Sequence, residues 1–293
     1  PDIKAPLSKE DTPEFRRKVL QPFMDVLTEL FEGNKKFRDF FLKTRAHKIQ
    51  YPCEKVPLCF IVQGPQGVGK TMLFDAIGRL VGHTHYYSTT KPDDLFGEHA
   101  EGFIHKLFVV MNECERRSTN ELESALKAAI TDVEMTVNAK FQRPFRIKNL
   151  ACVDVTTNKE NSIPIDTGTS DRRYLVSRAT KKYLQPKYNG TFWSRLAGHL
   201  RSKDFVRCLY DYLNNMDLTC IDWKAERKAN LTQSYFDMVK MTHPVEAFYF
   251  EAMYYHVNSD RYWEYFPEVR TRKNNPIKSG TMVAFDRSDL FKK

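Results

Sequence analysis

The stretch GPQGVGKT, at residues 64–71, limits the possible folds of this chain more than any other feature. It fits the pattern of a glycine, four residues, then Gly-Lys and a hydroxyl residue. Glycines allow a loop to wrap closely with its backbone N–H groups turned inward, and a following helix points its positive end at the same place. We therefore predict a phosphate-binding loop that comprises Gly64, Pro65, Gln66, Gly67, Val68, Gly69, Lys70 and Thr71.

The sequence on both sides of this loop supports the prediction. VPLCFIVQG, at 56–64, is a continuous apolar run typical of a strand that is buried on both faces of a parallel sheet. TMLFDAIGRLVG, at 71–82, has helical spacing and ends at Gly82. In such a context Lys70 reaches the β- and γ-phosphates of a nucleotide, and the Thr71 hydroxyl holds Mg²⁺. The alternative is a glycine turn without chemical meaning.

The rest of the chain predicts an α/β fold with a parallel sheet core. Helices are expected over 13–50, with Pro22 marking a kink or a boundary and Gly33 a stop. Buried strands are expected at 105–113 and 150–158, a helix at 118–131, two short strands around a basic tip at 134–149, and helices at 192–215 and 243–257. We expect three parts: an N-terminal helical segment (1–50), the core (51–180) and a C-terminal helical region (181–293).

Polar residues follow two of the expected strands. Asn112 and Glu113 end one strand, and Asn158 ends the next. The carboxyl ends of strands in open α/β sheets are where ligands bind, so these residues are expected beside the glycine loop. Glu113 could orient or deprotonate an attacking water, Asn112 could bind a metal-bound water, and Asn158 could contact a γ-phosphate. Polar strand ends at a surface, or an asparagine in a turn, are the competing interpretations.

Two arginines follow in TSDRRYLV, at 169–176. Arg172 or Arg173 could neutralise charge on a transferred phosphoryl group, and in a ring of subunits would act on the neighbour's nucleotide. Spacing does not separate the two, although we prefer Arg173. A surface pair with the nearby Asp171 is the alternative.

The ordered set GPQGVGKT, LFVVMNE, CVDVTTN and SDRRY resembles a superfamily 3 helicase, an AAA+-like ring motor of viruses and plasmids. The likeness is greatest to the helicase domains of viral and phage primase-helicases, and it extends over about residues 15–255. One departure is Asn112, where many such ATPases carry an acid. The resemblance implies ATP and Mg²⁺ as cofactors, Mg²⁺ at Thr71 and Asn112, and hydrolysis that uses the residues Lys70, Glu113, Asn158, Arg172 and Arg173.

The resemblance also implies partners and a location. It predicts a self-assembled hexamer with single-stranded DNA in a central channel, together with primase or polymerase modules in the same or another chain. It places the protein inside the host cell, in the cytoplasm or nucleus where the virus replicates. The polar, proline-broken start PDIKAPLSKEDTPEF predicts no signal peptide, and we expect no membrane span.

The stretch NAKFQRPFRIKN, at 138–149, combines basic and aromatic residues. Basic side chains meet backbone phosphates, and aromatic rings stack on bases. The family carries a DNA-contacting hairpin in this region. We therefore predict nucleic-acid contact first at Lys140 and Phe141, then at Arg143, with Lys127 on the preceding helix as a lesser candidate, and we expect Phe145 to lie in the core. A solvated hairpin is the alternative.

Charge and cysteine content narrow the function only slightly. Lys plus Arg number 46 and Asp plus Glu 37, and the formal charge of +9 is compatible with a polyanionic partner. The six cysteines include no C-x-x-C pair, which predicts reduced thiols and no zinc site.

Other functions remain open from the sequence. An ATPase that remodels or packages without unwinding would share the nucleotide site but not need the hairpin. A small-molecule kinase would need an acceptor pocket and a lid. Asn112 makes an inactive ATP-binding scaffold conceivable.

Overall fold

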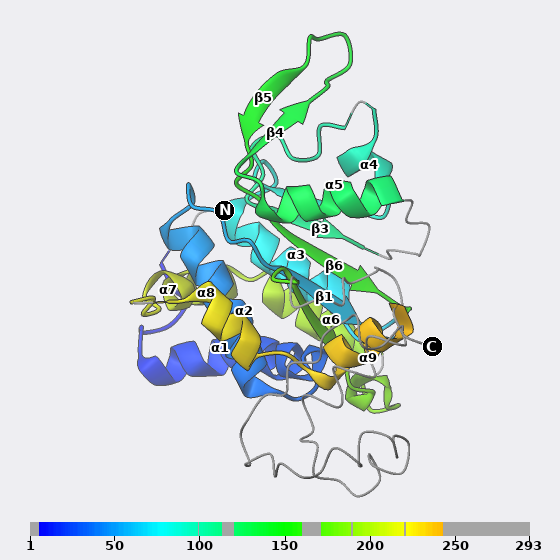
Figure 1. Cartoon of the computed structure of the whole chain (residues 1–293). Coiled ribbons are helices and arrows are strands. Elements are labelled where there is room, and N and C mark those ends of the chain that lie inside the picture. The colour runs from blue at the N-terminus through cyan, green and yellow to red at the C-terminus, as the bar shows by residue number, and fades with distance from the viewer. Residues whose placement is uncertain are drawn as a thin grey trace, which may run out of the picture. The chain divides into compact units, whose positions relative to one another are not determined.

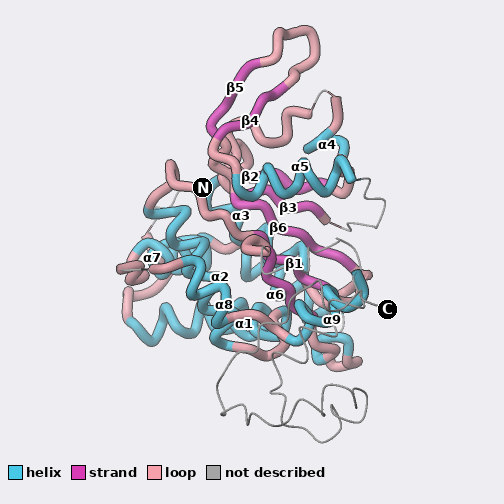
Figure 2. Tube along the Cα trace, viewed as in Figure 1, coloured by secondary structure: helices cyan, strands magenta, loops and turns pink. Residues whose placement is uncertain are grey.

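Five parallel strands form the central sheet, in the spatial order β2-β3-β6-β1-β7. Figures 1 and 2 show them running through the middle of the fold. Their bounds are β1 Cys59–Gln63, β2 Tyr86–Thr89, β3 Phe108–Met111, β6 Cys152–Thr157 and β7 Tyr174–Arg178. In the register, Ile61 of β1 lies opposite Val155 on one side and Val176 on the other. The predicted α/β class with a parallel sheet is confirmed.

The computed structural model describes residues 6–98, 100–112, 120–159, 171–188, 190–219 and 221–242. The chain divides into two compact units, Pro1–Thr242 and His243–Lys293, and every described residue belongs to the first. The helix predicted at 243–257 and the tail beyond it lie outside the described residues.

Helices and one hairpin complete the first unit. The helices are α1 Pro13–Leu30, α2 Lys35–Gln50, α3 Lys70–Val81, α4 Asp93–Phe96, α5 Asn120–Thr131, α6 Gly190–Leu200, α7 Lys203–Asn214, α8 Trp223–Ala229 and α9 Gln233–Thr242, with a 3₁₀ turn at Lys182–Leu184. The strands β4 Glu134–Val137 and β5 Phe145–Lys148 pair antiparallel as predicted, and Figure 1 shows this hairpin projecting from the sheet.

Successive side chains along each strand point to opposite faces of the sheet, so the apolar core has one part on each face. Phe60, Val62 and Leu175 belong to the cluster that also contains the buried side chains of α1, α2, α3, α6 and α7. The other face meets α9 at β7 and α5 at β6. The sheet is therefore covered by helices on both sides, which explains why every residue of β1, β3 and β6 is buried.

Two expectations about the helices need correction. Pro22 does not bound a helix, because α1 continues through it. Lys18 and Pro22 are both exposed, so water can satisfy the Lys18 carbonyl that the proline cannot bond. The helical stretch at 192–215 is two helices, α6 and α7, because the Ser202 hydroxyl caps the second by accepting from the Phe205 N–H at 3.2 Å.

A buried ion pair ties α2 to the centre of the sheet. Arg45 on α2 and Asp154 on β6 are only 2% and 1% exposed, and Arg45 Nη2 donates to Asp154 Oδ1 over 2.8 Å. The guanidinium lies 4.3 Å from the centroid of the Phe41 ring, and the Phe60 N–H also donates to Asp154 at 3.3 Å. Because water cannot replace either partner there, this pair holds α2, β1 and β6 in one arrangement.

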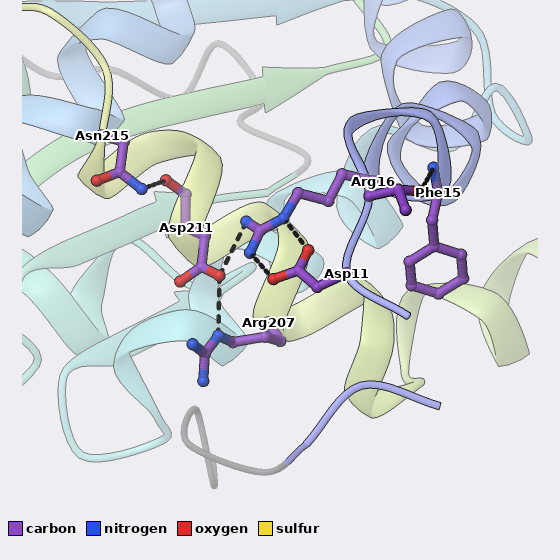
Figure 3. Close-up of polar contacts among 7 residues, drawn as sticks. Asp11, Phe15, Arg16, Arg207, Asp211 and Asn215 are labelled. Carbon is purple, nitrogen blue, oxygen red and sulfur yellow. Dashed lines mark hydrogen bonds and ion pairs between the residues drawn. The ribbon is translucent and has the colours of Figure 1, made fainter. Parts of the chain in front are cut away.

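Ion pairs on the exposed side of α1 are weaker by comparison. Arg16 pairs with Asp11 and, at 2.9 Å, with Asp211 of α7, which also accepts from Arg207 (Figure 3). Bonding to Arg16 lowers the pKa of Asp11. Asp11 is about half exposed, and water competes for such pairs, so they steer α1 against α7 without dominating its stability. No helix in the described residues is long and apolar enough to cross a membrane.

Replacing Arg45 by alanine should lower the free energy of unfolding by about 3–5 kcal/mol, because it leaves a buried carboxylate without its partner. Urea denaturation followed by circular dichroism measures this. Arg201→Ala, at an exposed position, is the matched control and should change the value by less than about 0.5 kcal/mol. Equal effects from the two variants would contradict the role given to the pair.

The same variant should show a characteristic pH dependence. Burial raises the pKa of Asp154, while Arg45 opposes that rise. Without Arg45 the folded-state pKa lies further above that of the unfolded chain, about 3.9. A raised carboxyl pKa contributes stability that is present below the unfolded pKa and lost as pH rises, so the deficit of the variant should shrink towards pH 4.

Candidate functional site

The loop between β1 and α3 has the backbone shape that only glycine adopts readily. Gly64, Gly67 and Gly69 have φ values of 151°, 88° and 90°. A Cβ atom on Gly69 would lie 2.7 Å from the Trp193 ring of α6, and one on Gly64 would lie 2.8 Å from the Cβ of Ala179. The loop thus lies directly against α6 and the residue that follows β7.

The start of α3 presents its first-turn N–H groups next to the glycine loop. Gly69 is its N-cap and supplies no side-chain bond to the first-turn N–H groups. Those groups, with the positive end of the helix, have the polarity that suits an anion beside the glycine loop. The backbone therefore fits a phosphate chain.

Lys70 lies at the centre of this arrangement and is 8% exposed. Its Nζ donates to the carbonyl oxygens of Gly64 and Pro65, at 2.6 and 3.0 Å, and to Oδ1 of Asn158 at 2.8 Å. Asn158 follows β6, and β6 pairs directly with β1. Two side chains predicted from separate motifs are therefore hydrogen-bonded to each other. A phosphate that bound to Lys70 would replace these neutral oxygens as the acceptor of its Nζ hydrogens.

Asn112 connects the neighbouring strands at the same edge. Its Oδ1 accepts from the Thr71 hydroxyl at 3.4 Å and from the Thr156 hydroxyl at 2.8 Å, while its amide nitrogen donates to the Ser88 hydroxyl at 2.6 Å. The facing oxygens of Thr71 and Asn112 are ligands of the kind Mg²⁺ accepts, together with water and substrate phosphates. The described residues contain no cluster of three or more His, Cys, Asp or Glu side chains suited to a metal. Glu113, the predicted base, lies outside the described residues.

The arginine turn lies at the opposite edge of the sheet. Because β7 runs parallel to β1 with Tyr174 opposite Cys59, Arg173 precedes the amino end of these strands, whereas the glycine loop follows their carboxyl end. Four residue steps of strand separate the two edges by roughly 13 Å. Arg172 is exposed and Arg173 half-buried. Neither arginine therefore lies beside the glycine loop of its own chain.

The β4–β5 hairpin presents an aromatic ring at its tip. Phe141 is 95% exposed with φ at 64°, a left-handed conformation that is costly for a bulky residue. The Nζ of Lys140 lies 5.1 Å from the centroid of the Phe141 ring, and Arg143 beside it is exposed. Phe145 is half-buried rather than in the core.

Lys127 differs from the other predicted nucleic-acid residues. On α5 it pairs with Glu123 one turn earlier, at 2.5 Å. The sequence reading also missed Ser88 and Arg178, which lie at the carboxyl edge on β2 and β7. Neither strand was predicted, so no signal assigned these residues to the site.

Comparison with known proteins supports the fold. A model for a family of unknown function (DUF5906) matches residues 62–173, from the glycine-loop strand to the arginine turn, which is less than half of the chain. None of the curated proteins matches the sequence. The apo structure of the NrS-1 C-terminal region (305–718) has a TM-score of 0.64 and 20% identity, over 92% of this chain and 65% of that one. Its A form has a TM-score of 0.62 and 21% identity, with the same coverage.

A JCV helicase bound to a small acetamide compound has a TM-score of 0.47 and 13% identity, over 84% of this chain and 63% of that one, which is too low to show a common fold. The chain therefore shares the fold of the NrS-1 region and spans 65% of its length.

Gly69→Ala should lower the free energy of unfolding by at least about 1 kcal/mol, because alanine is strained at this φ and its methyl group meets Trp193. Gly198→Ala is the matched control. It lies within α6 with open space around it, so alanine should raise the stability by about 0.5–1 kcal/mol. Shifts of the same sign in urea denaturation would contradict the loop geometry.

Proposed function

We propose that this chain is the ATP-hydrolysing motor of a ring-forming DNA helicase or translocase that acts in viral or plasmid replication. The observation that carries the proposal is the meeting of Lys70 with Asn158, and of Thr71 with Asn112, beside a glycine loop at one edge of the sheet. These residues come from three separate motifs, and each suits one part of a nucleoside triphosphate with Mg²⁺.

Each residue then has a defined role. Lys70 releases Gly64 and Asn158 to bind the β- and γ-phosphates. Thr71 and Asn112 would hold Mg²⁺, which when bound would draw charge from the phosphate oxygens. Glu113 accepts a proton from the attacking water as the water oxygen bonds to the γ-phosphorus. The bond between that phosphorus and the bridging oxygen breaks, and ADP and inorganic phosphate leave. Asn158 contacts the γ-phosphate and so distinguishes ATP from ADP.

The position of the arginines supports hydrolysis between subunits. Because they lie at the edge opposite the glycine loop, an arginine of one copy would complete the site of a neighbouring copy rather than its own. Such an arginine stabilises the charge on the transferred phosphoryl group. Shared sites of this kind favour a closed ring, in which every copy has a neighbour.

The hairpin supports single-stranded DNA as the partner. An exposed phenylalanine between basic side chains can stack on a base while Lys140 and Arg143 meet the backbone phosphates. The base of the hairpin is anchored, because Lys55 Nζ donates to the carbonyls of Ala129 at the end of α5 and Ala151 before β6, at 2.8 and 2.6 Å. Burial lowers the pKa of Lys55 to about 8. Movements of β6 and α5 would therefore reach the hairpin.

Lys70→Ala should reduce ATP turnover by at least about a hundredfold, because the variant loses a group that stabilises the transferred charge. Phosphate release is measured with and without single-stranded DNA, together with displacement of a strand from a forked duplex. Lys36→Ala, at an exposed position on α2, is the control and should match wild type. Wild-type hydrolysis that ignores DNA would favour a remodelling ATPase, and turnover that survives Lys70→Ala would refute the site.

Phe141→Ala should weaken single-stranded DNA binding by about 1–3 kcal/mol, the value of one stacked base. Fluorescence anisotropy with a labelled oligonucleotide measures it, and Phe141→Trp should retain the affinity. Hydrolysis without DNA should not change, because the Phe141 side chain is 95% exposed and so packs against little of the described chain. Equal affinity of wild type and Phe141→Ala would remove the hairpin from the DNA path.

A further inference from the structure

Asp171, the residue that precedes the two arginines, accepts hydrogen bonds from side chains of two helices, α8 and α9. Its Oδ2 accepts from Nη2 of Arg227 on α8 and from the hydroxyl of Tyr235 on α9, the latter at 2.9 Å. Its Oδ1 accepts from the backbone N–H of Arg173 at 3.0 Å. The side chains of Asp171 and Arg227 are 2% and 6% exposed. Both carboxylate oxygens are thus engaged, and the charge is matched within the protein.

The two helical partners are themselves fixed. Arg227 Nε donates to the Tyr174 carbonyl at 3.1 Å, and its guanidinium lies 5.4 Å from the centroid of the Tyr235 ring. Burial raises the pKa of Tyr235, so its hydroxyl keeps its proton and remains a donor. Arg227 therefore contacts the chain on both sides of Arg173, at Asp171 and at Tyr174.

Arg173 combines a fixed backbone with an unused side-chain donor. Its N–H bonds to Asp171, and its carbonyl accepts from the Cys59 N–H of β1 at 2.9 Å. The backbone of Arg173 is therefore fixed on one side by Asp171 and on the other by β1. Its Nε is buried and has no hydrogen-bond partner among the residues that the structure describes.

We propose that Arg227 and Tyr235 are positioning residues that hold Asp171, and through it the Arg172–Arg173 turn, in the place from which an arginine meets the triphosphate bound by a neighbouring copy. The inference rests on the proposed function and extends it from the catalytic core to α8 and α9. Its physical basis is geometric: a misplacement of about 1 Å in a group that stabilises a transition state can cost a hundredfold in rate.

The test uses Tyr235→Phe in the full chain, because it removes one hydroxyl and keeps the ring. Turnover of ATP in the assembled particle should fall roughly tenfold or more, while the affinity for ATP stays unchanged, because the glycine loop is untouched. Tyr212→Phe on α7 is the matched control and should behave as wild type. Unchanged turnover in Tyr235→Phe would overturn the inference.

Mixed particles separate a positioning role from a merely structural one. Tyr235→Phe subunits keep a complete glycine loop, and Lys70→Ala subunits keep a complete arginine turn. At some interfaces, a Lys70→Ala copy supplies its arginine to the glycine loop of a Tyr235→Phe copy. Hydrolysis should recover there, because both contributed parts are intact. The mixture should therefore exceed either variant alone by several-fold. A damaged fold of the Tyr235→Phe subunit would not be repaired in this way, so absence of recovery overturns the positioning role.

Two further variants complete the design. Arg173→Ala mixed with Lys70→Ala should recover activity in the same manner; if it does not, the shared site of the proposed function fails, and the positioning role fails with it. Arg227→Lys keeps a positive charge near Asp171 but loses the planar fork that also reaches the Tyr174 carbonyl. It should reproduce the effect of Tyr235→Phe in both assays, and wild-type turnover from Arg227→Lys would overturn the role of Arg227.

Discussion

The parallel alignment of β1 and β7 is the constraint on which the rest of the account depends. It places the glycine loop after one end of these strands and the arginine turn before the other. A parallel sheet cannot bring the two together within one chain, because every strand separates its own amino and carboxyl ends. If both groups serve one triphosphate, as we propose, they must come from different copies of the chain.

At the carboxyl edge, the strand order decides which side chains meet. Because β6 lies between β1 and β3, Asn158 comes to Lys70 on one side, and Thr156 comes to Asn112 on the other. The buried ion pair of Arg45 and Asp154 holds β6 against α2. The same strand is connected to the hairpin base through Lys55, so the edge that would bind nucleotide and the tip that would bind DNA share one structural element.

The sequence predicts β1 and β3 from continuous apolar runs and α3 from its glycine signals, and it also predicts β6 and the hairpin. It does not predict β2 and β7. β2 is an outer strand of the sheet and most of its residues are half-buried, so its sequence YYST has no apolar run. β7 has only three apolar residues before Ser177. The sequence predicts that Lys70 and Asn158 lie on the same side of the sheet, but not that they form a hydrogen bond, because the bond depends on β6 lying next to β1. The bonds from Arg227 and Tyr235 to Asp171 join segments far apart in sequence, and no local pattern marks them.

In the proposed mechanism, a complete catalytic site forms only between copies of the chain. The most direct measurement is ATP turnover per subunit as the protein concentration is varied, with saturating single-stranded DNA and with particle mass followed in parallel. We expect turnover per subunit to be close to zero for the monomer and to rise together with assembly. Constant turnover per subunit, maintained while the protein is monomeric, would contradict it.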